Sequence, residues 1–176
     1  MVDVLTSEQR HLNMSRIRSA DTVPEMLLRC ALHRRGIRYR LHRKDLPGCP
    51  DITLPKYKSV IFINGCFWHG HECAMFKLPA TRREFWETKI QKNRKRDMRA
   101  LSALISDGWR TFVLWECAIR GPARRPLDTI VGEIIFWLEG VEPSGVLPCD
   151  GQNQHYGCVE ERKGKKPHCK TQDAGC

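Results

Sequence analysis

Residues 59–73 read SVIFINGCFWHGHEC, a short apolar run that passes directly into a cluster of metal-ligating and aromatic residues. The run SVIFI is rich in β-branched residues, which predicts a buried strand. The segment after it, 64–73, holds two cysteines and two histidines together with Phe67 and Trp68. The stretch therefore predicts a strand that leads directly into a candidate functional site.

The elements on either side follow from apolar periodicity, capping residues and Gly or Pro boundaries. Thr22 with Glu25, and Thr81 with Glu84, have the spacing of capping boxes at helix starts. The segment 51–54 should form a hairpin with the strand at 59–63, because a short PKYK turn separates them. The other predicted elements are a helix over 22–36, a strand over 37–43, a helix over 83–106, a strand over 109–115 and a helix over 126–140.

This order, helix, three strands, helix, strand, helix, describes an α/β protein with a mixed β-sheet flanked by helices. The long helix should turn Phe85, Ile90, Met98, Leu101 and Leu104 or Ile105 toward the core. We expect one domain over residues 1–140, with a polar arm at 1–20. Residues 141–176 are rich in Gly, Pro and charge and are predicted to be a poorly ordered tail outside the core.

The composition favours a partner with phosphate charges. Lys and Arg number 30 against 20 Asp and Glu, which gives a net charge of +10. The first residues do not resemble an export signal, and no apolar run approaches bilayer length. Nine cysteines, an odd number, fit reduced thiols and metal ligation better than a disulfide framework. These features predict a cytoplasmic protein associated with the nucleoid rather than a membrane.

Cys66, His71 and Cys73 are closely spaced, and Cys117 directly follows the strand predicted at 109–115. Three thiolates and one imidazole form a closed tetrahedral set for structural zinc. Buried free thiols are the alternative, although the clustering makes it the weaker one. The spacing also allows His69 as the fourth ligand, but a histidine in a glycine-containing loop after a strand is well placed to act as a general acid or base, or to hold metal-bound water.

Two carboxylates have both a structural and a catalytic interpretation. Asp51 opens a predicted buried strand, where its charge would be costly unless a cation or a partner binds it. A turn-capping role after PGCP explains Asp51 equally well. The capping box alone would explain Glu25.

The helix over 83–106 carries Trp86, Lys89, Asn93 and Asp97 on one stripe, separate from its apolar face. An aromatic ring, a cation, an amide and a carboxylate suit base stacking, base contacts and the edge of an active site. A solvated helix face is the alternative. Phe67 and Trp68 also lack an obvious core position, and aromatic wedges between base pairs are a physical use for such rings.

Four segments together resemble one protein family over roughly residues 8–139. They are IRSADTVPEMLLRCALHRRGIRYRLHRKDLPGCPD, VIFINGCFWHGHEC, FWETKIQKNRKRD and GWRTFVLWECAIRG. In order and motif spacing they look like the very short patch repair DNA mismatch endonucleases. These enzymes are relatives of restriction endonucleases with a Pro-Asp…Asp/Glu-x-Lys core. The resemblance implies a restriction-endonuclease-like fold with a structural zinc site.

It also implies a magnesium-dependent hydrolase that nicks one strand 5′ to the thymine of a T:G mismatch left by deamination of 5-methylcytosine. Asp51 and the backbone carbonyl of Ile63 would bind Mg²⁺. His69 and Glu25 would hold or deprotonate water bound to the metal, and Asp97 would support the site. The remaining roles would be zinc ligation by Cys66, His71, Cys73 and Cys117, a wedge of Phe67, Trp68 and Trp86, and base contacts by Lys89 and Asn93.

The implied partner is double-stranded DNA with a T:G mismatch, bound by a monomer whose amino-terminal arm closes over the minor groove. Mismatch-repair proteins and a DNA cytosine methyltransferase system are further implied partners. One residue departs from the family, because Asn64 stands where a histidine is usual. Asparagine cannot transfer a proton near pH 7, so we expect weakened cleavage. The alternatives are a zinc-stabilised DNA-binding module without cleavage and an endonuclease of the same fold with another target.

Overall fold

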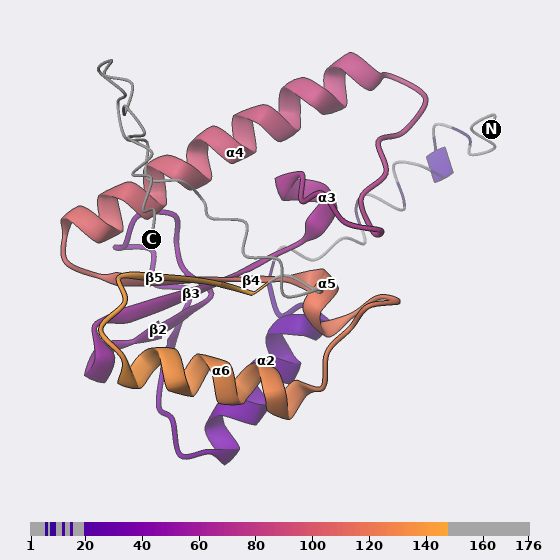
Figure 1. The fold of residues 1–176 in the computed structure, drawn as a ribbon. Coiled ribbons are helices and arrows are strands. Elements are labelled where there is room, and N and C mark those ends of the chain that lie inside the picture. The colour runs from indigo at the N-terminus through magenta and orange to yellow at the C-terminus, as the bar shows by residue number, and fades with distance from the viewer. Residues whose placement is uncertain (1–5, 7, 10–11, 13–14, 16–19, 148–176) are drawn as a thin grey trace, which may run out of the picture.

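The protein was analysed as a computed structural model, which describes residues 6, 8–9, 12, 15 and 20–147. A five-stranded sheet with the order β1-β2-β3-β4-β5 forms its centre (Figure 1). The strands are β1 Arg40–Leu41, β2 Ile52–Leu54, β3 Ser59–Asn64, β4 Arg110–Trp115 and β5 Ser144–Leu147. β1, β2 and β3 pair antiparallel, whereas β3, β4 and β5 pair parallel, so the sheet is mixed.

Helices cover both faces of the sheet. The helical elements are α2 Val23–Arg34, η1 Pro55–Tyr57, α3 Cys66–His69, α4 Arg83–Ser106, α5 Glu116–Ile119 and α6 Leu127–Glu139. Figure 1 shows α2 and α6 side by side on one face and α4 on the other. Parallel strands need such crossover helices, and burial on both faces explains why β3 and β4 read as continuous apolar runs. The predicted α/β class with a mixed sheet flanked by helices is confirmed.

The core has two parts, one on each face of the sheet. The larger lies under α2 and α6, where Ile61, Phe112 and Leu114 of the sheet meet apolar residues of both helices, Leu28, Leu32, Ile130, Val131 and Ile134. The smaller lies on the α4 face, where Val113 and Trp115 pack with Cys66 and Cys117. Alternate residues of β4 thus serve opposite faces. The smaller core attaches the segment that follows β3 to the sheet.

The long helix was predicted with its correct bounds but with too wide an apolar face. Ile90 and Leu104 are buried, whereas Phe85 is 45% and Met98 is 39% exposed. Only part of α4 lies over β4, and its amino-terminal half packs against the short helix α3 instead. Of the two alternative core residues, Leu104 is the buried one, whereas Ile105 is 40% exposed.

Two boundaries also differ from the prediction. The strand expected at 37–43 is reduced to the edge strand β1, and Leu41 in it is exposed. The sheet does not end before residue 140, because Ser144–Leu147 add β5 beside β4 and bury Leu147. The core thus continues to Leu147. The rest of the predicted tail and most of the amino-terminal arm lie outside the described residues.

Neither predicted capping box forms as expected. The Thr22 hydroxyl donates to Glu25 and makes no cap hydrogen bond to the backbone, while the Asp21 amide donates to the same carboxylate. At α4 the residue before the helix is Arg82, in the left-handed region, rather than Thr81. In the part of the chain that the structure describes, no helix is long and apolar enough to cross a membrane.

Candidate active site, metal cluster and aromatic surface

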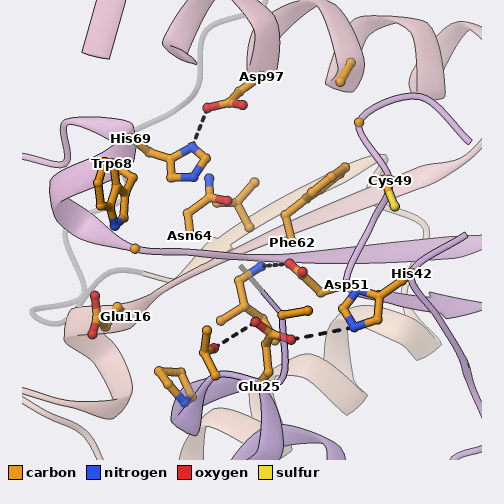
Figure 2. A pocket seen from close by; sticks show the side chains of 18 of the residues that line it. Glu25, His42, Cys49, Asp51, Phe62, Asn64, Trp68, His69, Asp97 and Glu116 are labelled. Carbon is orange, nitrogen blue, oxygen red and sulfur yellow. Dashed lines mark hydrogen bonds and ion pairs between the residues drawn. The ribbon is translucent and has the colours of Figure 1, made fainter. Parts of the chain in front are cut away.

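An open pocket of about 1230 Å³ lies where the loop before α2, the start of β2, the end of β3 and the middle of α4 meet. Figure 2 shows Asp51, Glu25 and His42 gathered below β3, with Asn64, His69 and Asp97 above it. All six line the same pocket, and Trp68 lines it as well. Asp51, Glu25, Asn64, His69 and Asp97, which were singled out in separate segments of the sequence, are thus brought to one place.

Asp51 stands at the entry to β2, and its side chain reaches across to β3. Its Oδ2 accepts a hydrogen bond from the Ile63 amide at 2.7 Å. Burial raises the pKa of this carboxyl from 3.8 to about 6, since desolvation outweighs the Ile63 hydrogen bond and the nearby Glu25 charge adds to the increase. A cation at this carboxylate would compensate for the cost of burying its charge.

The residues around Asp51 fit a hard cation. In a β-strand the N–H and C=O of one residue point to the same edge, because paired residues exchange both hydrogen bonds. The Ile63 amide points to Asp51, so the Ile63 carbonyl also faces that side of β3. A carboxylate and a backbone carbonyl are oxygen ligands of the kind that Mg²⁺ takes.

Glu25 is 3% exposed and lies in the first turn of α2. Its Oε2 accepts hydrogen bonds from the Asp21 amide at 3.0 Å and from Arg29 Nη2 at 2.8 Å. Its Oε1 accepts from the Thr22 hydroxyl at 2.8 Å. These contacts satisfy the buried charge and fix the carboxylate on the wall of the pocket.

His69 and Asp97 form the second polar group of the pocket. His69 is the last residue of α3, and its Nδ1 lies 2.5 Å from Oδ2 of Asp97 on α4. A proton on Nδ1 that is donated to Asp97 leaves Nε2 as the acceptor. Asn64, which is 8% exposed, ends β3 beside this pair (Figure 2).

Cys66, His71, Cys73 and Cys117 come together as a possible metal-binding group. Their ligand atoms all lie within 4.8 Å of one another, and Cys117 Sγ is 3.4 Å from His71 Nδ1. Ligands on one tetrahedral zinc lie roughly 3.8 Å apart, for Zn–S bonds of about 2.3 Å. His71 is stacked on Trp115, with ring centroids 4.2 Å apart, which holds the imidazole in place. Because His71 joins the thiols and His69 contacts Asp97, the arrangement separates the two histidines.

A surface formed by α3, the start of α4 and the loop between them carries the predicted aromatic residues. Phe67 contacts Trp68 and Trp86 edge-on, with ring centroids 5.1 and 5.2 Å apart. Phe85 and Phe76 extend the group, which we call the aromatic cluster: Phe67, Trp68, Phe76, Phe85 and Trp86. Lys89 Nζ lies 5.5 Å from the centroid of the Trp68 ring. Large, partly exposed rings with a cation above them form a surface suited to stacking on nucleic-acid bases.

The residues of the predicted stripe lie on one face of α4, and each of them contacts α3: Trp86, Lys89, Asn93 and Asp97. Asn93 Nδ2 donates to the Trp68 carbonyl at 2.9 Å, so this amide holds the wedge segment in place. Base contact by Asn93 would require that hydrogen bond to open. Arg94, which the sequence did not single out, donates to the carbonyls of His69 and Gly70. The stripe therefore fixes the turn that carries His69 and Trp68.

The sequence also did not single out Arg29, which lies behind the pocket wall, or His42, which lines the pocket. Arg29 is buried and contacts Asp21, Glu25 and His42. The four-residue separation of Glu25 and Arg29 on a predicted helix was the available signal for an ion pair. His42 had no such signal, because its position depends on how β1 ends.

The comparisons with known proteins identify one family. Residues 2–75 match the family model described as DNA mismatch endonuclease Vsr. The chain is 49% identical over 119 residues to the Type II nicking enzyme V.XorIIP of Xanthomonas oryzae, which covers 68% of this chain and 88% of the relative. It is 42% identical over 136 residues to the Type II nicking enzyme V.NmeAIP of Neisseria meningitidis, which covers 76% and 97%.

A further relative is the DNA mismatch endonuclease Vsr of Escherichia coli, 40% identical over 151 residues. That match covers 86% of this chain and 97% of the relative. The chain belongs to the DNA mismatch endonuclease Vsr family.

Proposed function

We propose that this protein is a Mg²⁺-dependent DNA endonuclease that nicks one strand 5′ to the thymine of a T:G mismatch, in very short patch repair. The relatives are named as a mismatch endonuclease and as nicking enzymes, which supports a nuclease acting on DNA. The observation that carries the proposal is one pocket lined by Asp51, Glu25 and His69 and also by Trp68 of the aromatic cluster.

Asp51 and the Ile63 carbonyl would hold the magnesium ion. When bound, Mg²⁺ supplies charge stabilisation for the phosphate that is attacked. In the protein, Asp51 is already fixed by the Ile63 amide, so little rearrangement of this side chain is needed to present its second oxygen.

His69 is suited to move a proton at the reacting phosphate. Its contact with Asp97 orients the ring and leaves Nε2 to accept a proton from water in the pocket. Hydrogen bonds to both of its oxygens hold the Glu25 carboxylate in one orientation on the opposite wall. From there it would orient that water. The two side chains approach the pocket from α3 and α2, on either side of β3.

The aromatic cluster would open the stack beside the mismatch. Unstacking costs a few kcal/mol per base step, and a mismatched pair lowers that cost. Phe67, Trp68 and Trp86 are the wedge, and Lys89 supplies a cation at its edge. Deformability of the mismatch therefore contributes to selectivity, as well as contacts with the bases.

A zinc ion bound by Cys66, His71, Cys73 and Cys117 would be structural. The group joins the turn after α3 to α5, and four protein ligands leave no open position for catalysis. Its role is to hold α3, and with it His69 and Trp68, against the end of β4.

Asn64 favours a second candidate function, a zinc-stabilised mismatch-binding module with weakened or lost cleavage. A pure binding protein, however, has little need for an oriented His69–Asp97 pair or for a buried Asp51. A third candidate is an endonuclease of the same fold with another target.

Labelled duplexes that carry T:G or C:G at a methylated-cytosine context separate the three. With Mg²⁺ we expect one nick 5′ to the thymine in the T:G duplex and none in the C:G duplex, and brief addition of EDTA should stop the reaction. Mismatch binding without any nick would support the binding module. Equal nicking of both duplexes, or a nick elsewhere, would support another target.

A further inference from the structure

Arg29 is a buried cation that contacts three residues of the pocket wall, Asp21, Glu25 and His42. It is 4% exposed and lies on the second turn of α2. Nη1 donates to Oδ1 of Asp21, and Nη2 donates to Oε2 of Glu25 at 2.8 Å. Nη2 also lies 2.7 Å from Nε2 of His42, across from the end of β1. One guanidinium thus joins the start of α2 to the loop after β1.

The partners of Arg29 have the composition of a metal site. Asp21, Glu25 and His42 each offer a ligand atom, and these atoms all lie within 4.8 Å of one another. Two carboxylates and an imidazole are donors that Mn²⁺ and Zn²⁺ readily accept. The guanidinium lies among them, and its contact with His42 requires Nε2 to be the acceptor, so the imidazole there is the neutral Nδ1–H form.

The positive charge of Arg29 offsets negative charge at the pocket. Asp21, Glu25 and Asp51 place three carboxylates around one side of the pocket. A fixed cation among the first two offsets their charge without a second ion. The planar fork of arginine also holds Glu25 in a single orientation.

We propose that Arg29 is a positioning residue whose guanidinium acts as a fixed cation among Asp21, Glu25 and His42. It keeps divalent ions out of this ligand set and directs the Glu25 carboxylate into the pocket beside Asp51. The claim that Arg29 positions Glu25 rests on the proposed nuclease function. The claim that Arg29 keeps divalent ions out of the ligand set does not.

The first test measures metal binding by the full chain without DNA. Arg29→Met removes the charge at similar volume, and titration calorimetry with Mn²⁺ should show one ion more than the wild type binds. Arg29→Met combined with His42→Ala should lose that ion again. Arg125→Met is the matched control, since Arg125 pairs with Glu133 away from the pocket, and it should gain none.

Circular dichroism establishes that each variant is folded. Arg29→Gln, which keeps hydrogen-bond donors without the charge, replaces Arg29→Met if the latter does not fold, and the same additional ion is expected. Arg29→Lys keeps a cation and should gain no ion. Variants without a positive charge at position 29 that bind no additional Mn²⁺ would overturn the fixed-cation assignment.

The second test asks whether Arg29 acts through Glu25. Arg29→Met should slow single-turnover nicking of a T:G duplex by about 10²-fold, the cost of a misplaced group in an active site. In a Glu25→Gln background the same change should cost less than about threefold, because there is no carboxylate left to orient. Equal losses in both backgrounds would overturn the positioning role and indicate a purely structural one.

The two tests separate this inference from the proposed function. A wild type that never nicks would refute the nuclease and, with it, the part assigned to Glu25. The Mn²⁺ titration would still decide whether Arg29 excludes an ion from its three partners.

Discussion

Asn64 is the residue whose side chain most directly limits the proposed chemistry. It lies at the end of β3 in the pocket, beside His69, and its amide cannot donate or accept a proton near pH 7. Asn64→His should therefore raise the single-turnover nicking rate, by up to about 10²-fold, the lower range of general acid catalysis. Asn64→Gln is the matched control and should give no increase. A rate unchanged by the histidine would mean that no proton transfer occurs at this position.

Asp51 should make the metal-free protein less stable than it would be without a charge there. Its pKa in the folded protein, about 6, lies above the ordinary value of 3.8, so folding favours the protonated form. The destabilisation caused by Asp51 therefore becomes smaller as the pH falls from about 6 toward 4. Asp51→Asn, which keeps an oxygen for the Ile63 amide, should raise the free energy of unfolding at pH 7 by up to about 3 kcal/mol.

Urea unfolding of both proteins in the absence of Mg²⁺, at pH 7 and pH 4, checks this expectation. The difference should shrink to about 0.5 kcal/mol at pH 4, where Asp51 is protonated in the folded state and a little under half protonated in the unfolded state. A constant difference at both pH values would show that packing, and not charge, separates them.

The short helix α3 is the element that carries the wedge. Trp68→Ala should weaken binding to a T:G duplex far more than binding to a fully paired duplex, because the ring acts only where the stack opens. Phe136→Ala is a suitable control: Phe136 is 80% exposed on α6, on the opposite face of the sheet. Fluorescence anisotropy with both duplexes makes the comparison. Equal losses on the two duplexes would assign Trp68 to packing rather than to mismatch recognition.

The junction of α3 and α5 should depend on a metal ion. Metal analysis of purified protein is expected to give close to one zinc per chain, since thiolate ligation is coupled to folding. Cys73→Ser should lower both the zinc content and the melting temperature, while Cys30→Ser, at an exposed thiol outside the group, should change neither. A fully folded protein without zinc would remove the structural role from these residues.

Local sequence patterns correctly predicted those helices and strands that are determined mainly by their own residues. The three long helices and the strands β2, β3 and β4 follow from apolar periodicity and boundary residues, and their bounds are nearly as expected. Strand β5 was missed because SGVL has a weak strand pattern and is stabilised by pairing with β4, far away in the sequence. Phe85 and Met98 were placed in the core because periodicity identifies a helix face but not how far the sheet extends beneath it.

Contacts between distant segments decide the rest of the site. Cys66, His71 and Cys73 are close in sequence, so their grouping was visible, whereas the position of Cys117 required the parallel pairing of β3 and β4. The His69–Asp97 pair required α4 to pack against α3. Arg29 also links Asp21, just before α2, to His42, just after β1, and no local pattern encodes that contact.

In the molecule as a whole, different residues should hold the DNA and cut it. The net charge of +10 and the aromatic cluster should hold a mismatched duplex without the pocket carboxylates. Cleavage should depend on Asp51, which lies on the other side of β3 from the wedge.

The most direct test is Asp51→Ala, assayed for single-turnover nicking and for binding on the same T:G duplex with Mg²⁺. We expect nicking to be abolished while the dissociation constant stays within about threefold of the wild-type value, because Asp51 would bind the cation and is not part of the surface that holds the DNA. An Asp51→Ala protein that still nicks 5′ to the thymine at the wild-type rate would contradict the assignment of the active site.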